Sequence, residues 1–155
     1  MRVVKRASSY MVVGACLVLA ATWSLRQAVA QQTSSSAATP SLDYEFFKAK
    51  VEPVFLAKRA GHTRCVVCHA VNNAPFHLVR LSPGSTTWNE EQSRQNFQLI
   101  QKVVVPGYDG SKLVTHPLAE EAGGDPHHGG GQQFQSKDDP EWQTLKAFAL
   151  GATLK

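Results

Sequence analysis

Two cysteines, Cys65 and Cys68, followed at once by His69, constrain this chain more than any other feature. The C-x-x-C-H spacing is the attachment signature of a c-type haem. Two intervening residues let both sulfurs form thioethers to the porphyrin, and the adjacent imidazole reaches the iron from the proximal side. A disulfide would not require His69, a zinc site would need further Cys or His pairs, and a redox dithiol would need a βαβ pattern. The motif therefore predicts one covalent haem c.

The first thirty residues have the pattern of a secretory signal peptide. A basic start precedes residues 10–25, which are mostly apolar but short for a membrane span. Ala28-Val29-Ala30 is an A-x-A cleavage site, so we expect the mature chain to begin near Gln31 and to be periplasmic or secreted. An uncleaved anchor is the alternative. A lipoprotein at Cys16 is disfavoured, because most of the apolar stretch follows that residue.

Loss of this segment changes the charge of the chain. Of 16 Lys and Arg residues four lie in the first thirty, so 12 remain against 12 Asp and Glu. Haem propionates would make the protein more acidic still. These numbers argue against nucleic acid as a partner, and we expect contact with a membrane only during export. Redox proteins are the predicted partners, and the sequence leaves the oligomeric state open.

The rest of the chain divides into a linker and one domain. Residues 31–40 are rich in Gln, Ser, Thr and Ala and lack periodicity, which is typical of a flexible linker. Residues 41–155 suffice for one small domain. A domain of this size has a limited core, which a covalent haem would complete.

A first helix is predicted directly before the C-x-x-C-H motif. Its apolar face has helical spacing: Tyr44, Phe47, Val51 and Phe55. Ser41 is the expected cap and Gly61 the expected end. Pro53 lacks a backbone donor, so it should kink or split the helix near Val51.

Two further helices are predicted beyond the motif. Asn89 and Gln92 form a potential capping box for a helix that Pro106 should stop. Asp139 precedes a proline at the first position of the last helix, which Gly151 should end. The inner face of this last helix comprises Trp142, Leu145, Phe148 and Ala149.

The intervening segments read as irregular. Residues 76–81 have the imperfect alternation of a short strand. Residues 108–135 form a long, glycine-rich loop without obvious secondary structure, and a loop of this length is usually functional or disordered. Three histidines in it favour a function. The expected fold class is therefore all-α, a small helical domain around one haem.

The order of these elements resembles the class I cytochrome c fold. More narrowly, the chain is similar to exported single-haem cytochromes over residues 54–59, the C-x-x-C-H motif, 87–94, 116–131 and 138–142, which together span most of the mature chain. The resemblance implies that the first and last helices cross near the haem edge. It also implies that the loop before the last helix supplies the distal iron ligand.

Methionine, the usual distal ligand in that fold, is excluded here if the signal peptide is cleaved. The chain has two methionines, Met1 and Met11, and both lie in the first thirty residues. This is a departure from the pattern of class I cytochromes. Five histidines besides His69 remain as candidates.

His128 is the first choice for the distal ligand and His116 the second. His128, like His127, lies in the loop that carries the distal residue in the resembled fold, and three glycines after it permit close approach to a flat macrocycle. The backbone of His116 is restricted by the proline that follows. His62 is too close to Cys65 to reach the far face, and His77 is better suited to a propionate. An open or water-ligated iron is the remaining alternative.

Several charged residues admit two interpretations. Arg59, Arg64 and Arg80 are candidates to pair with haem propionates, although solvated surface is as good an account of each. Glu120, Glu121 and Asp125 form either an acidic docking rim or simply a soluble loop.

The predicted function is electron transfer through a haem with both axial positions filled, so we expect a carrier rather than an enzyme. A haem enzyme or gas sensor with a displaceable distal ligand is the alternative from another class. A redox subunit tethered by residues 31–40 to an exported dehydrogenase shares the chemistry and differs only in its partner.

The distal ligand has a measurable consequence for the reduction potential. Thioether sulfur favours ferrous iron and raises the potential, whereas two imidazoles lack this effect. We expect a midpoint potential below that of Met/His cytochromes with similar haem burial. An equilibrium redox titration measures it, and a midpoint in the high Met/His range would contradict bis-histidine ligation.

Overall fold

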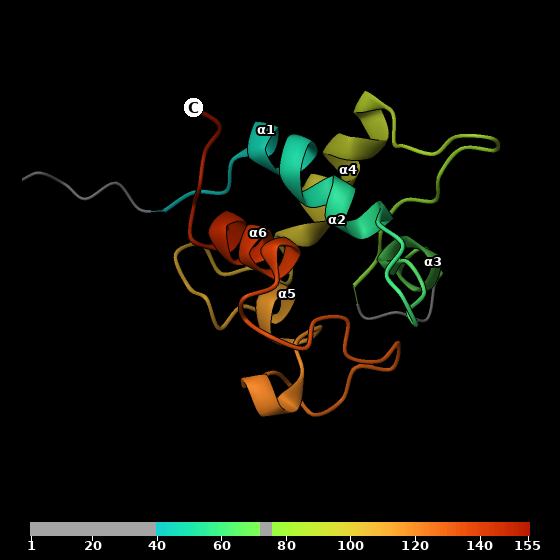
Figure 1. Cartoon of the computed structure of the whole chain (residues 1–155). Helices are drawn as coiled ribbons and strands as arrows, with labels where there is room; N and C mark the ends of the chain where they lie inside the picture. Colours follow the sequence, from blue (N-terminus) through green and yellow to red (C-terminus); the bar gives the residue numbers. More distant parts are fainter. Residues whose placement is uncertain (1–39, 72–75) are drawn as a thin grey trace, which may run out of the picture. The chain divides into compact units, whose positions relative to one another are not determined.

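The computed structural model describes residues 40–71 and 76–155 (Figure 1). The expected signal peptide, 1–30, and all but the last residue of the expected linker, 31–40, lie outside the described residues. The described residues all belong to the unit 38–155. They form helices and no strand, which confirms the all-α prediction and shows that 76–81 is not a strand. One isolated bridge pairs Leu118 with Phe134.

The first helical segment consists of α1 (Tyr44–Phe46), the π-helical turn η1 (Phe47–Val51) and α2 (Glu52–Leu56). The regular α-helical pattern is thus interrupted directly before Pro53, as predicted, because proline has no N–H to give to the preceding turn. The wider π-helical turn accommodates the missing hydrogen bond, and the helical segment continues into α2.

Both predicted ends of this segment are wrong. Asp43, not Ser41, caps it, because the Asp43 carboxylate accepts the Phe46 N–H at 2.6 Å. The helix also ends at Leu56 rather than at Gly61, because Ala57 already has an extended backbone.

The remaining helices are α3 (Cys65–His69), α4 (Glu90–Ile100), α5 (Lys112–Thr115), the 3₁₀ turn η2 (Glu120–Ala122) and α6 (Pro140–Ala149). Asn89 and Gln92 form the predicted capping box of α4. This helix ends at Ile100, earlier than predicted, because Lys102 and Val103 make tighter turn bonds. Elements α5 and η2 lie in the loop that was expected to lack secondary structure.

The start of α6 agrees with the prediction. The Asp139 carboxylate accepts the N–H groups of Glu141 and Trp142 at 2.8 and 3.1 Å. Gly151 follows the last turn with a φ of 89°, a conformation that favours glycine. The predicted inner face of α6 is buried.

Phe47 is the centre of an aromatic core. Its ring lies 6.4 Å from that of Phe55, 5.5 Å from Phe97 on α4 and 5.7 Å from Phe148 on α6. Phe47 and Phe148 are fully buried. This cluster joins the first helical segment to α4 and α6, which Figure 1 shows grouped together. The helix α3 and the long loop form the rest of the domain.

A buried polar cluster is set into the packing between α2 and α4. Ser93, fully buried, donates its hydroxyl to a Glu52 carboxylate oxygen at 3.1 Å. Asn96, also fully buried, accepts the Val79 N–H at 2.7 Å. Burial raises the pKa of the Glu52 carboxyl, which the Ser93 hydrogen bond only partly offsets.

Residues 40–71 and 76–155 contain no helix of the length and hydropathy needed to cross a membrane.

Replacing Glu52 with Gln tests this cluster. Because the pKa of Glu52 is higher in the folded than in the unfolded state, ionisation costs stability as pH rises through the folded value. We expect Glu52→Gln to raise the free energy of unfolding at about pH 8 and to have little effect at about pH 4, where the carboxyl is largely neutral in both states.

Denaturant unfolding at both pH values measures the difference. Glu121→Gln, at an exposed glutamate, is the matched control and should change the unfolding free energy by less than about 0.5 kcal/mol at either pH. An equal effect of Glu52→Gln at the two pH values would contradict the account.

Candidate functional site

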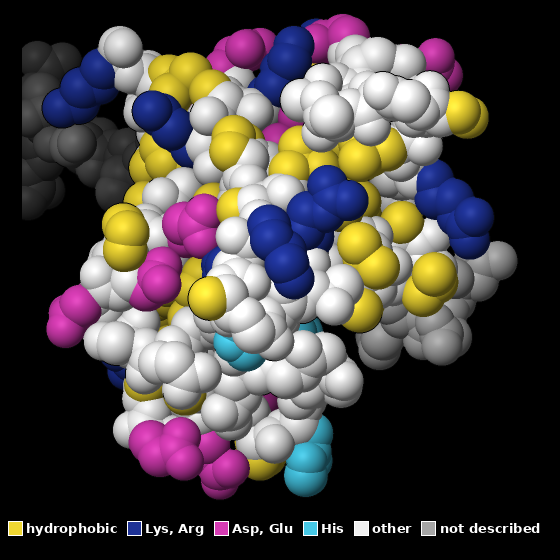
Figure 2. Space-filling model, turned by 45° about the vertical axis from the view of Figure 1, so that its right-hand side comes forward, with side chains coloured by type: hydrophobic (Ala, Val, Ile, Leu, Met, Phe, Trp, Pro, Cys, Tyr) yellow, Lys and Arg dark blue, Asp and Glu magenta, His cyan; other side chains and the backbone are white. Residues whose placement is uncertain are grey.

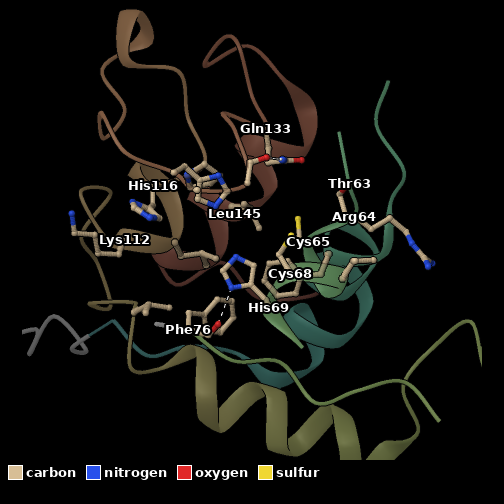
Figure 3. Close-up of a pocket in the computed structure, with 18 of the residues that line it drawn as sticks. Thr63, Arg64, Cys65, Cys68, His69, Phe76, Lys112, His116, Gln133 and Leu145 are labelled. Atoms are coloured by element: carbon tan, nitrogen blue, oxygen red, sulfur yellow. Dashed lines mark hydrogen bonds between the residues drawn. The ribbon is translucent and has the colours of Figure 1, made fainter. Parts of the chain in front are cut away.

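A cavity of about 760 Å³ lies between α3 and the segment from α5 to α6 (Figure 3). Apolar side chains make up much of its wall, among them Phe55, Leu113, Phe134 and Leu145. A volume of this size is within the range of cavities that enclose a small-molecule ligand or cofactor.

The C-x-x-C-H motif supplies one side of the cavity. Cys65 and Cys68 lie three residues apart in α3, on neighbouring turns of one helix face, and both thiols are free. Burial raises the pKa of the Cys65 thiol, although the Arg59 guanidinium lies 3.7 Å from its sulfur. Figure 3 shows both cysteines beside His69, with His116 and Gln133 across the cavity.

His69 offers one ring nitrogen to the cavity. Its Nδ1 lies 2.7 Å from the carbonyl oxygen of Phe76, so Nδ1–H donates and Nε2 carries the free lone pair. Burial lowers the pKa of this imidazole and favours the neutral form. A neutral imidazole whose second nitrogen is fixed by a carbonyl is the usual state of a metal-ligating histidine.

His128 repeats this arrangement from the other side. Its Nδ1 lies 2.5 Å from the carbonyl oxygen of Gly131, which again leaves Nε2 free. The rings of His69 and His128 have centroids 6.2 Å apart and planes that differ by 20°. Imidazole nitrogen binds metals at about 2 Å, so two imidazoles facing each other through one metal ion have centroids about 6 Å apart.

His116 is the third imidazole of the cavity. Its Nδ1 lies 3.1 Å from a carboxylate oxygen of Asp125, and its ring stands at 80° to that of His128, 5.0 Å away. Lys112 also donates to Asp125, at 2.6 Å, and this hydrogen bond holds the pKa of the Asp125 carboxyl below its usual range. His116 is thus tied to a charged group rather than to the backbone.

The other histidines do not line the cavity. His62 lies behind Gln133, with its Nδ1 3.5 Å from the amide nitrogen. His77 is exposed and bonds to the Val71 carbonyl, and His127 is exposed. Figure 2 shows histidine side chains reaching the surface in the lower half of the face drawn there. The cavity therefore gathers His69, His116 and His128.

The three arginines predicted as partners of haem propionates also differ in whether they line the cavity. Arg59 is mostly buried and pairs with Glu141 at 2.5 Å, so its guanidinium is committed inside the fold. Arg80 donates to the Ala70 carbonyl, whereas Arg64 lines the cavity and points outward in Figure 3. Arg64 is therefore the one of the three arginines that lies at the cavity.

The carboxylate of Asp125 already pairs with Lys112 and His116, so Asp125 is only partly available for the acidic docking rim suggested by the sequence. Glu120 and Glu121 are exposed.

One cavity residue, Gln133, was not predicted from the sequence. It is only 7% exposed, and its amide oxygen is buried without a hydrogen-bond partner. Glutamine has no motif or periodicity that marks such a role. Only the three-dimensional path of the loop reveals it.

Within the described residues, no group of three or more His, Cys, Asp or Glu side chains converges closely enough to hold a metal ion. What the cavity offers is a pair of near-parallel imidazole rings with centroids 6.2 Å apart, together with the thiols of the C-x-x-C motif. Comparison of the chain with models of known protein families, with curated proteins and with solved structures found no match.

Proposed function

We propose that this protein is an exported electron carrier with one haem c. Cys65 and Cys68 hold the haem covalently, and His69 and His128 are the axial ligands of its iron. In this proposal the domain is a small cytochrome similar to class I, with histidine where that class has methionine. In this proposal residues 1–30 are an export signal, and the protein works in the periplasm or outside the cell.

The observation that carries the proposal is the pair of imidazoles of His69 and His128. Their centroid separation of 6.2 Å is close to that of two imidazoles bound to one metal ion through nitrogens at about 2 Å. Both Nδ1 atoms are already bonded to backbone carbonyls. Each imidazole thus has one nitrogen fixed by a carbonyl and the other available to bind iron. The C-x-x-C thiols line the same cavity, which is the combination that a covalent haem with two axial histidines requires.

The remaining features of the cavity fit a haem. Its volume and apolar wall suit a flat macrocycle, and the absence of a converging ligand cluster in the described residues argues against a bare ion. A haem held here supplies a ferrous/ferric couple that exchanges one electron.

The chain's own residues have distinct roles in this function. The carbonyls of Phe76 and Gly131 fix the tautomer and orientation of the two imidazoles and increase their basicity. Apolar residues such as Phe134 and Leu145 exclude water from the cavity. Cys68 and Val67 are exposed at its edge, where a redox partner can approach in a small, transient contact.

His128 is a better axial ligand than His116. The His128 ring lies 6.2 Å from that of His69, close to the separation of two imidazoles on one metal ion, whereas the ring contact of His116 is with His128, at 5.0 Å. His116 remains the second candidate, because it lines the same cavity.

Alanine variants of the two histidines test this assignment. We expect His128→Ala to convert a low-spin ferric signal into a largely high-spin one, because the iron loses a strong-field ligand. His116→Ala is the matched control and should remain low-spin. Low-temperature magnetic resonance of the purified haem proteins measures both, and the reverse pattern would assign the distal position to His116.

The carrier function is tested with carbon monoxide. With both axial positions filled, the ferrous optical spectrum should remain low-spin and unchanged on addition of the gas. Rapid binding, or a high-spin ferric spectrum, would instead support a haem enzyme or gas sensor.

Covalent attachment is tested in the same preparation. Cys65→Ala with Cys68→Ala should abolish haem that survives denaturation, whereas Val67→Ala, between the two cysteines, should retain it. Wild-type protein without covalent haem would refute the proposal.

A further inference from the structure

We infer that Gln133 is a positioning residue that fixes the orientation of the His128 imidazole. The inference rests on the proposed function, because it assigns Gln133 a role toward the distal iron ligand. The hydrogen bonds, the burial and the anchoring of Gln133 each support it.

The hydrogen bonds place Gln133 against the turn that follows His128. The Gln133 amide nitrogen lies 3.2 Å from the carbonyl oxygen of Gly130 and 3.4 Å from that of Gly131. The Gly131 oxygen is the same atom that accepts the His128 Nδ1 proton. Gln133 and His128 thus share one acceptor, and the direction of this carbonyl determines where the imidazole points.

The turn itself needs such a restraint. It closes through the Gly131 N–H and the His128 carbonyl at 2.8 Å, and Gly131 has a φ of 77°. Two further glycines precede Gly131 and offer no side chain to pack. A sequence of this kind has many alternative conformations, so a buried side-chain clamp limits which of them the imidazole can adopt.

Gln133 is well anchored for this purpose. Its own N–H and that of Phe134 donate to the Pro117 carbonyl at 2.8 and 3.0 Å, and the Ala119 N–H donates to the Phe134 carbonyl at 2.8 Å. The Phe134 ring is buried and lies 4.7 Å from the Arg59 guanidinium carbon. The backbone of Gln133 is therefore held to residues 117–119 by hydrogen bonds.

Gln133 also connects the two sides of the cavity. Its amide nitrogen lies 3.5 Å from Nδ1 of His62, three residues before the start of α3. Figure 3 shows Gln133 across the cavity from His69. Through Gln133, the segment leading into Cys65 is linked to the turn that carries His128.

Two substitutions test the clamp in the haem protein. Gln133→Leu removes both donors at similar volume, and Gln133→Glu sets a carboxylate against the Gly130 and Gly131 carbonyls. Because the His128 ring is then less restrained, we expect a broadened or split low-spin signal and a changed midpoint potential. Loss of two amide hydrogen bonds should also make cyanide displace the distal ligand about tenfold faster.

Gln135→Leu is the matched control. Gln135 is exposed and donates only to the Gln132 carbonyl at 3.3 Å, so this variant should keep the wild-type signal, potential and cyanide rate. Gln133 variants that also keep all three would overturn the inference. If His128→Ala changes the spin state while the Gln133 variants change nothing, the inference fails and the proposed function stands.

A measurement on the unmutated protein covers variants that do not fold. In the diamagnetic ferrous state, the side-chain amide protons of Gln133 should exchange slowly with solvent, because they are buried and bonded to carbonyls. Fast exchange would overturn the inference. Wild-type protein that carries no covalent haem would overturn both the proposed function and this inference.

Discussion

The Nδ1–H of His69 and that of His128 each donate to a backbone carbonyl, and the candidate site depends on this pair of hydrogen bonds. Phe76 provides one acceptor, 2.7 Å from His69, and Gly131 the other, 2.5 Å from His128. Each bond fixes the tautomer and leaves Nε2 as the nitrogen with a free lone pair. Without these bonds the orientation of either ring, and with it the near-parallel arrangement of the two, would be less restrained.

The fold holds these two carbonyls in place by different means. The aromatic cluster around Phe47 joins the first helical segment, α4 and α6, and α2 contacts α3, which carries His69. The His128 side has little regular structure and is instead held by backbone bonds from 117–119 to 133–134. A helical part and a hydrogen-bonded loop thus line an apolar cavity, and the loop is the side on which substitutions should alter ligand geometry first.

Local chemistry determined what could be predicted from the sequence. The caps at Asn89 and Asp139 were predictable because a side chain there bonds to backbone N–H groups two or three residues on. The cap at Asp43 and the end of the first helix at Leu56 were missed, because several nearby residues are competent caps and stops. The C-x-x-C-H motif is local as well. The approach of His128 to His69 and the burial of Gln133 depend on how a long loop folds back, which no short pattern encodes.

The central claim is that His69 and His128 are the axial ligands of the proposed haem, and the line shape of the ferric magnetic resonance spectrum of the unmutated protein tests it most directly. Because the His69 and His128 planes differ by only 20°, the account predicts one rhombic low-spin signal, as near-parallel axial imidazoles give. A high-spin signal would contradict it by showing an open axial position. The strongly anisotropic low-spin signal of perpendicular imidazoles would contradict it equally, because the two rings would then not have the relative orientation that this account requires.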